Sequence, residues 1–347
     1  MKSKGIVILS GFVVILLTAC SLLDKVGNQV QSTLIPSQES TIQESSVPAQ
    51  ATMEEIGVTP TENSPDLPPG GCPENIGKIV FQYDPMDRET VHHGIYLMSA
   101  DGSGRVRLSG EDEIHHTQPS WSPERCRIAF RSYTKDGDDD IYVMNADGSN
   151  IQRLTTDPER DMFPDWSPDG KQIVFTSYRN GGIRNLWIMN ADGSDQHQLT
   201  FNPAEYTQWE RWSPVGDEIA YIFHPQGDTD KGGVIYLINA DGSNVRQLTP
   251  DAGALGDTDL TWSPDGTKVY FISNRSHYVE VWEINADGSG MRQLTHSDNV
   301  SITHSLRVSP DGTKLAFYGI GPDAEQNGEE IYVINVDGSG LTAISLS

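Results

Sequence analysis

Residues 161–200 read DMFPDWSPDGKQIVFTSYRNGGIRNLWIMNADGSDQHQLT, and this stretch holds the signals of four short β-strands. Lys171–Thr176 and Leu186–Met189 are apolar runs of the kind that form buried strands. Gln196–Thr200 reads as a shorter strand, and the residues before Trp166 read as a strand that enters the first turn. The stretch therefore predicts one four-stranded unit.

Glycine-containing turns separate these strands, at Ser167–Gly170, Asn180–Gly182 and Asp192–Ser194. In the first turn, Pro presets φ, Asp caps its own backbone and Gly permits a left-handed residue. In the other two, Gly supplies the positive φ that a tight hairpin needs. The turns therefore predict strands joined by hairpins.

The same unit recurs after about Cys72. Asp-Gly-Ser begins at Asp101, Asp147, Asp192, Asp241, Asp287 and Asp337, in steps of 46, 45, 49, 46 and 50 residues. Trp-Ser-Pro begins at Trp121, Trp166, Trp212 and Trp262, and Val308 replaces the Trp in a fifth copy. A period of about 40 to 50 residues with four short strands is typical of a β-propeller blade. We therefore predict an all-β domain over 72–347, one six-bladed β-propeller of four-stranded blades.

Two further pieces of the repeat connect it to a known family. Ile141–Ser149 reads IYVMNADGS, and Arg153–Thr155 reads RLT. With Trp-Ser-Pro-Asp-Gly, these resemble the TolB-type propeller repeat, also found in the propeller domains of prolyl-oligopeptidase-like peptidases. The resemblance covers about residues 72–347. It implies a cell-envelope protein partner docking on one propeller face, which in the TolB family is a peptidoglycan-associated lipoprotein.

The N-terminus looks like a bacterial lipoprotein signal. Lys2 and Lys4 precede Gly5–Leu17, an apolar run that is short for a membrane span and suits a signal-peptide core. Leu17-Thr18-Ala19-Cys20 then resembles a lipobox. We predict a signal peptide over 1–19 and diacylglycerol on Cys20, which would anchor the protein without spanning the membrane. The alternative is an ordinary secretory signal with a chance cysteine.

Residues 20–71 predict a disordered tether. Ser, Thr, Gln, Glu and Pro dominate this segment, and it has no sustained apolar period. Such a composition buries too little apolar surface to offset chain entropy. TolB differs here, because it carries a folded α/β domain before its propeller and is soluble in the periplasm, so no binding residue is carried over from it.

The first blade is the irregular one. Aligning Phe81 with Phe175 puts Cys72 where Trp166 stands, so the innermost strand of this blade is expected to be short or missing. Cys126 lies five residues after Trp121, near the same turn of the next blade. In an oxidising compartment the two cysteines form an even pair. We predict a Cys72–Cys126 disulfide, with two free thiols as the alternative.

The formal net charge of −25 restricts the classes of partner. An acidic surface repels phosphate backbones, so we expect no nucleic acid binding. Cationic partners and metal ions would be attracted. Solubility alone is the other explanation of the charge.

Metal sites find little support. Asp136, Asp138 and Asp140 imitate the first three ligands of an EF-hand loop, but Ile141 replaces the required Gly and begins a strand. Neighbouring His pairs at 92–93 and 115–116 point to opposite strand faces. We expect solvated carboxylates and surface histidines rather than a cofactor, with calcium at the aspartates as the alternative.

The candidate ligand site is the central channel, which the strands before each Trp-Ser-Pro would line. The fifth position before the Trp and the position directly before it differ from blade to blade, whereas the turn residues do not. The titratable and basic candidates at these positions, with the neighbour of Thr303, are His116, Asp161, Asp165, Arg211, Asp257, His304 and Arg307. Such a ring could bind a peptide, a sugar or an ion, and a water-filled channel is the alternative.

No enzyme signature occurs in the sequence: it contains no Gly-x-Ser-x-Gly elbow, no zinc spacing and no phosphate-binding glycine loop. We therefore predict a monomeric, lipid-anchored, extracytoplasmic module that binds or assembles envelope proteins. Two alternatives stay open. One is a channel-centred hydrolase or lyase acting on glycan or peptide, and the other is a sensory or solute-binding lipoprotein.

Overall fold

The computed structural model describes most of the chain from Cys72 onward. The described residues are 72, 75, 78–83, 93–99, 103–110, 114–134, 139–179, 181–201, 205–225, 232–250, 256–276, 278–296, 300–321 and 329–344. All of them belong to one unit of the chain, Glu62–Ser347. The predicted signal peptide, Cys20, the tether, Asp136 and Asp138 lie outside them.

The described strands form six antiparallel sheets, each built from consecutive strands, and we call the sheets blades 1 to 6. Blade 1 contains β1 (Lys78–Tyr83), β2 (Gly94–Ser99) and β3 (Val106–Arg107). Blade 2 contains β4 (His115–Trp121), β5 (Arg127–Tyr133), β6 (Asp139–Asn145) and β7 (Gln152–Arg153). Blade 3 contains β8 (Asp161–Trp166), β9 (Gln172–Ser177), β10 (Asn185–Asn190) and β11 (His197–Gln198).

The second half of the domain repeats this order. Blade 4 contains β12 (Glu205–Trp212), β13 (Glu218–Pro225), β14 (Val234–Asn239) and β15 (Arg246–Gln247). Blade 5 contains β16 (Asp257–Trp262), β17 (Lys268–Ser273), β18 (Glu280–Asn285) and β19 (Arg292–Gln293). Blade 6 contains β20 (Ser301–Val308), β21 (Lys314–Ile320), β22 (Glu329–Asn335) and β23 (Thr342–Ile344).

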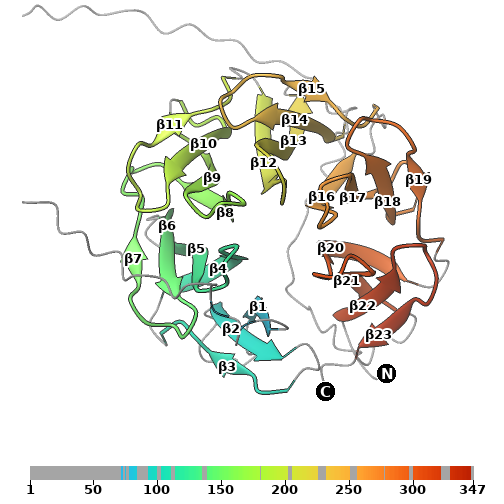
Figure 1. The fold of residues 1–347 in the computed structure, drawn as a ribbon, viewed down its shortest axis with the longest axis horizontal. Helices are drawn as coiled ribbons and strands as arrows, with labels where there is room; N and C mark the ends of the chain where they lie inside the picture. The colour runs from blue at the N-terminus through green and yellow to red at the C-terminus, as the bar shows by residue number, and fades with distance from the viewer. Residues whose placement is uncertain are drawn as a thin grey trace, which may run out of the picture. The chain divides into compact units, whose positions relative to one another are not determined.

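The blades stand around a central axis, with the first strand of blades 2 to 6 innermost (Figure 1). The prediction of an all-β, six-bladed propeller is confirmed. Blade 1 has three strands among the described residues. In it, Phe81 pairs with Tyr96 as Phe130 pairs with Tyr142 in blade 2, so the position without a described strand is the innermost one. No helix in the described part of the chain is long and apolar enough to cross a membrane.

The repeated turns are held by their own side chains. In Trp-Ser-Pro-Asp-Gly, Asp169 Oδ1 accepts hydrogen bonds from Ser167 Oγ at 2.7 Å and from the backbone N–H of Lys171 at 3.1 Å. Gly193 of Asp-Gly-Ser has φ +85°, and a Cβ there would lie 2.9 Å from the Leu154 carbonyl oxygen of the preceding blade. Only glycine fits that contact without a shift.

The core lies between blades. Trp166 of blade 3 is 5% exposed and packs against Ala129 and Val143 of blade 2. Its indole Nε1 donates to the Ser120 carbonyl oxygen at 3.3 Å, and Arg127 stacks over the ring at 4.6 Å. Because each blade buries one apolar face on each neighbour, no blade has a complete core of its own.

Each innermost strand of blades 2 to 6 has a bulge three residues before the Trp position. The residues there have positive φ although none is glycine: Gln118 (54°), Phe163 (58°), Trp209 (54°), Asp259 (44°) and Ser305 (63°). The strand registers shift at the same place. A non-glycine residue in this region costs on the order of 1 kcal/mol, and the cost recurs in five strands, so the fold requires the bulge.

A disulfide joins the start of the described chain to blade 2. Cys72 and Cys126 are bonded, with Cα atoms 5.2 Å apart. The backbone N–H of Cys72 also donates to the Glu124 carbonyl at 3.0 Å, and Asn75 Nδ2 donates to the Arg125 carbonyl at 2.8 Å. The segment before β1 is therefore tied to the β4–β5 turn.

Candidate functional site: the central channel

Two of the predicted channel carboxylates are buried inside the blades. Asp161 and Asp257 have no exposed surface. Asp161 Oδ2 lies 2.6 Å from Arg179 Nη2, and Asp257 is paired with Arg275 while accepting from Thr249 Oγ1 at 2.5 Å. The prediction that these two residues line the channel is corrected, because each is one half of an internal ion pair.

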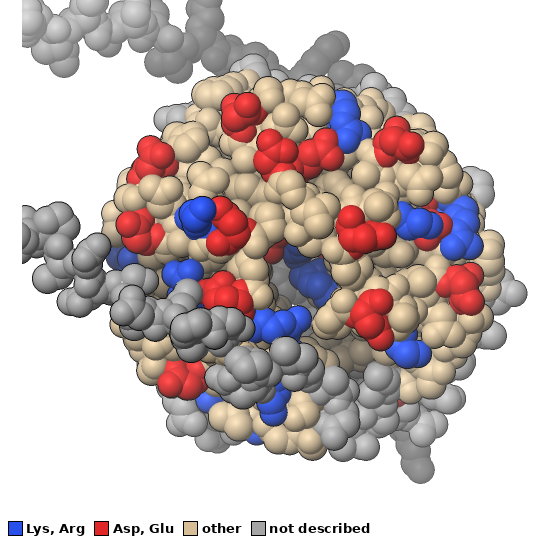
Figure 2. Space-filling view, viewed as in Figure 1, with Lys and Arg blue, Asp and Glu red and all other residues tan. Residues whose placement is uncertain are grey.

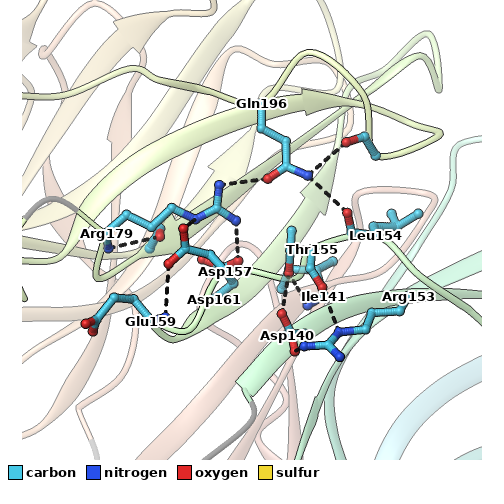
Figure 3. Close-up of polar contacts among 12 residues, drawn as sticks. Asp140, Ile141, Arg153, Leu154, Thr155, Asp157, Glu159, Asp161, Arg179 and Gln196 are labelled. Atoms are coloured by element: carbon cyan, nitrogen blue, oxygen red, sulfur yellow. Dashed lines mark hydrogen bonds and ion pairs between the residues drawn. The ribbon is translucent and has the colours of Figure 1, made fainter. Parts of the chain in front are cut away.

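The Asp161 pair belongs to a polar network that connects blades 2 and 3 (Figure 3). Arg179 Nη1 donates to Gln196 Oε1 at 2.7 Å, and Gln196 Nε2 donates to the Leu154 carbonyl at 3.0 Å. Burial raises the pKa of Asp161, and hydrogen bonds from Ser177 and Arg179 oppose that rise. Such networks fix the position of one blade on the next.

Asp140 has the same structural role in blade 2. It is 1% exposed, it is paired with Arg153, and its Oδ1 accepts from Thr155 Oγ1 at 3.1 Å. Burial raises the pKa of Asp140, and the charge of Arg153 opposes the rise. Within the described ranges no group of three His, Cys, Asp or Glu residues is placed to hold a metal ion.

The two predicted histidines lie in different surroundings. His116 is 5% exposed, with its ring centroid 5.3 Å from that of Phe130. His304 is exposed, and its ring lies 5.1 Å from that of Tyr318. Of these two residues, His304 is the one accessible to a ligand.

Asp165 ties three innermost strands together. Its Oδ1 accepts from Ser120 Oγ of blade 2 at 2.8 Å, and its Oδ2 accepts from the backbone N–H of Trp212 in blade 4 at 2.8 Å. Both carboxylate oxygens are therefore used within the ring. Asp165 therefore has a structural role between the innermost strands.

Asp259, at the bulge of blade 5, does the same for blade 6. Its Oδ2 accepts from the backbone N–H groups of Ser305 and, at 3.1 Å, Leu306. Its Oδ1 lies 3.4 Å from Arg307 Nη1. The bulge residues of successive blades touch elsewhere too, because Gln118 Oε1 accepts from the Phe163 N–H at 2.8 Å.

Arg211 and Arg307 occupy the position directly before the Trp in blades 4 and 6. Nη1 of each guanidinium donates to the carbonyl of the preceding residue, at 2.7 Å for Arg211 and 2.6 Å for Arg307. Partial burial, and then the charge of Arg211, lower the pKa of Arg307, which remains cationic at neutral pH. Half of the Arg307 side chain is accessible to water. No hydrogen bond from Nε or Nη2 of either arginine is found within the described part of the chain.

Glu210, directly before Arg211, is fully buried. Its Oε2 accepts from Thr176 Oγ1 of blade 3 at 2.8 Å, and its Oε1 has no hydrogen-bond partner among the described residues. Burial raises the pKa of Glu210 to about 8, so the carboxyl is protonated at pH 7. A neutral acid therefore lies beside Arg211.

Glu210 and Asp259 could not be predicted as site residues from simple strand alternation. That alternation, counted back from the Trp, fails at the bulge, which shifts the register of the strand. An available signal was that the other blades have Pro119, Pro164, Leu260 and Leu306 where blade 4 has Glu210. Together, the channel residues provide acids that are occupied by neighbouring blades and arginines with unused donors. Figure 2 shows Lys and Arg side chains at the central opening and Asp and Glu side chains spread over the surrounding face.

Comparisons with known proteins agree with this architecture. TolB from Acinetobacter baumannii superposes with a TM-score of 0.61 and 21% identity over 76% of this chain, which spans 62% of that protein. The putative TolB from Agrobacterium tumefaciens gives 0.57 and 22%, covering 69% of this chain and 83% of that one. An oligogalacturonate lyase in complex with manganese gives 0.58 and 16%, covering 79% and 75%. These likenesses show the fold.

A comparison with curated proteins finds no match. The sequence itself matches the family profile described as the TolB beta propeller domain over residues 86–232 and 211–347. Since these segments cover most of the chain, the protein belongs to the TolB β-propeller domain family.

Proposed function

We propose that the protein is a non-catalytic binding module of the bacterial cell envelope. It is held at a membrane by diacylglycerol on Cys20, and a protein partner docks on the propeller face around the central opening. Membership of the TolB family supports the envelope role. The docking role rests on the channel chemistry.

The observation that carries the proposal is the contrast between the acids and the arginines of the channel. Asp165 accepts hydrogen bonds from Ser120 Oγ and the Trp212 N–H, and Asp259 accepts from the Ser305 and Leu306 N–H groups and lies 3.4 Å from Arg307 Nη1. Arg211 and Arg307 each have donors with no described partner, and guanidinium groups bind carboxylates and carbonyl oxygens with good geometry. A partner that inserts an acidic or carbonyl-bearing segment fits this opening.

A hydrolase or lyase has less support. Acid–base catalysis needs titratable groups, such as an imidazole or a carboxyl, within reach of a bound substrate. Asp161 and Asp257 have no exposed surface and are paired with arginine, and His116 is 5% exposed. Of the candidate residues His116, Asp161, Asp257 and His304, this leaves His304 as the exposed one.

The test is cross-linked affinity purification from solubilised membranes, comparing the native chain with the double variant Arg211→Ala/Arg307→Ala. The matched control is Arg160→Ala/Lys171→Ala, which removes two basic side chains that are 59% and 80% exposed and are not at the position directly before the Trp. We expect a stoichiometric partner with the native chain and the control, and its loss with the channel variant. A partner retained equally by both variants, or no stoichiometric protein at all, would contradict the proposal.

A further inference from the structure

The interface between blades 5 and 6 differs from the other inter-blade contacts. Elsewhere the Trp of one blade packs on small or aliphatic side chains of the preceding blade. These contacts are Trp166 on Ala129 and Val143, Trp212 on Val174 and Ile188, and Trp262 on Ala220 and Leu237. The same two positions of blade 5 are Tyr270 and Glu283, and the Trp position of blade 6 is Val308. The blade 5–6 interface therefore lacks the Trp indole, and Tyr270 and Glu283 stand where the other interfaces have small or aliphatic side chains.

A pocket of about 370 Å³ opens at this interface. Its floor includes Tyr270 and Glu283, both 3% exposed. Turns of both blades form the walls, because the pocket is lined by Pro264 and Thr267 of blade 5 and by Gly312 and Val336 of blade 6. The volume is at the lower end of the range of small-molecule sites.

The floor is polar and ordered. Glu283 Oε1 lies 2.8 Å from Lys268 Nζ and 2.6 Å from Arg292 Nε. Burial opposes ionisation, but the hydrogen bonds from Arg292 and Lys268 hold the pKa of Glu283 below its ordinary value. The Tyr270 hydroxyl makes no hydrogen bond that the described residues account for. Because Tyr270 lies on the floor of the pocket, its hydroxyl needs a hydrogen-bond partner from solvent or from a ligand.

The rim carries three ionised carboxylates, Asp265, Asp311 and Asp337. In each, Oδ1 accepts hydrogen bonds from its own turn, such as Ser263 Oγ to Asp265 at 2.6 Å. The Ser and Thr donors of these turns lower the pKa of Asp265 and Asp311 to about 2. The charge of Arg292 also lowers the pKa of Asp337, and within the described ranges no ion pair at salt-bridge distance is found for these three residues.

The lining therefore has four carboxylates and two basic side chains, so its net charge is negative. The acidic residues are not placed to hold a metal ion within the described part of the chain. A larger cation with several N–H donors could reach the rim oxygens and the Tyr270 hydroxyl at once.

We propose that this pocket binds an ammonium or guanidinium group, either of a small free amine or of a basic side chain on another protein. The site lies outside the channel and goes beyond the proposed function. Arg211→Ala/Arg307→Ala should therefore leave it unchanged, which separates a failure here from a failure of the docking proposal.

The experiment is calorimetric titration of the native chain at low ionic strength with Nα-acetyl-arginine amide, putrescine and the neutral analogue Nα-acetyl-citrulline amide. We expect saturable binding of the two cations, weakened by salt, and no binding of the citrulline derivative. Tighter binding of the arginine derivative would point to a protein side chain as the natural ligand, and tighter binding of putrescine to a free amine.

Three variants locate the binding. Asp265→Asn/Asp311→Asn should weaken it by at least about ten-fold. Asp169→Asn, the equivalent turn residue of blade 3, should leave it unchanged. Tyr270→Ala/Val308→Trp recreates the Trp–Ala pair of the other interfaces and should abolish binding, while thermal unfolding verifies that the variant is folded. No saturable binding of either cation, or equal affinity in the Asp265/Asp311 and Asp169 variants, would overturn the proposal.

Discussion

Glu210 shows what a single buried side chain contributes to this propeller. It stands where other blades have proline or leucine, and its Oε1 has no hydrogen-bond partner in the described part of the chain. The folded protein keeps this carboxyl protonated up to a pKa of about 8, whereas the unfolded chain ionises it near pH 4.5. Between these values folding takes up a proton, so this residue makes the protein less stable as the pH rises.

We predict that Glu210→Gln removes this dependence, because the glutamine is neutral at every pH. The variant should match the native chain at about pH 4.5 and exceed its unfolding free energy by on the order of 3 kcal/mol at pH 7. Denaturant unfolding at several pH values measures the difference. The exposed Glu159→Gln serves as the control and should shift neither curve; a parallel response of the two variants would refute the argument.

At the scale of the strand, the sequence predicted the elements well and the channel residues less well. The alternation of apolar runs with Asp-Gly-Ser and Ser-Pro-Asp-Gly located the strands, since both signals are local. The bulge could not be predicted, because its left-handed residues are Gln118, Phe163, Trp209, Asp259 and Ser305, none of which is a glycine that would reveal it. Each bulge adds one residue, so side chains beyond it no longer follow simple alternation.

The bulge also explains why the prediction that Asp161 and Asp257 line the channel was wrong. Asp161 and Asp257 are separated from their Trp by the bulge, and their arginine partners, Arg179 and Arg275, come from the strand end that follows. Such an ion pair cannot be predicted from the sequence, because only the folded hairpin brings the aspartate and the arginine together. The indole contacts, by contrast, follow directly from the repeat.

We predict that Trp166→Ala lowers the unfolding free energy by about 3 to 5 kcal/mol, because it removes a 5% exposed indole from the blade 2–3 interface. Trp121→Ala is the matched control. Trp121 is only partly buried, against the three described strands of blade 1, so its loss should be smaller. Equal losses in denaturant unfolding would argue against an inter-blade role for Trp166.

At the scale of the whole domain, the Cys72–Cys126 disulfide ties down blade 1, which has three strands among the described residues. The bond spans a sequence separation of 54 residues. Closing a loop of that length restricts the unfolded chain by about 4 kcal/mol in the chain-entropy model. The chain has three cysteines, and assigning Cys20 to lipidation left Cys72 and Cys126 as the predicted pair. The position of the bond beside the described sheet of blade 1 could be seen only in the structure.

We predict that a Cys20→Ser chain, denatured without reductant, exposes no free thiol, and that Cys72→Ser/Cys126→Ser lowers stability by about 2 to 5 kcal/mol. Thiol titration and denaturant unfolding provide the two measurements. Finding two titratable thiols, or an unchanged midpoint in the double variant, would show that the ring does not depend on this bond.

The bulge also has an evolutionary consequence. Because the backbone, rather than the residue type, turns one side chain of each innermost strand out of the sheet alternation, amide, aromatic, acidic and hydroxyl groups all occupy that position here. The scaffold thus accepts several residue types at these five positions, although Gln118 and Asp259 also hydrogen-bond to the next blade here. Related propellers can therefore differ in the chemistry of the channel without any change in topology. An engineered library that varies only these five positions would sample that chemistry directly.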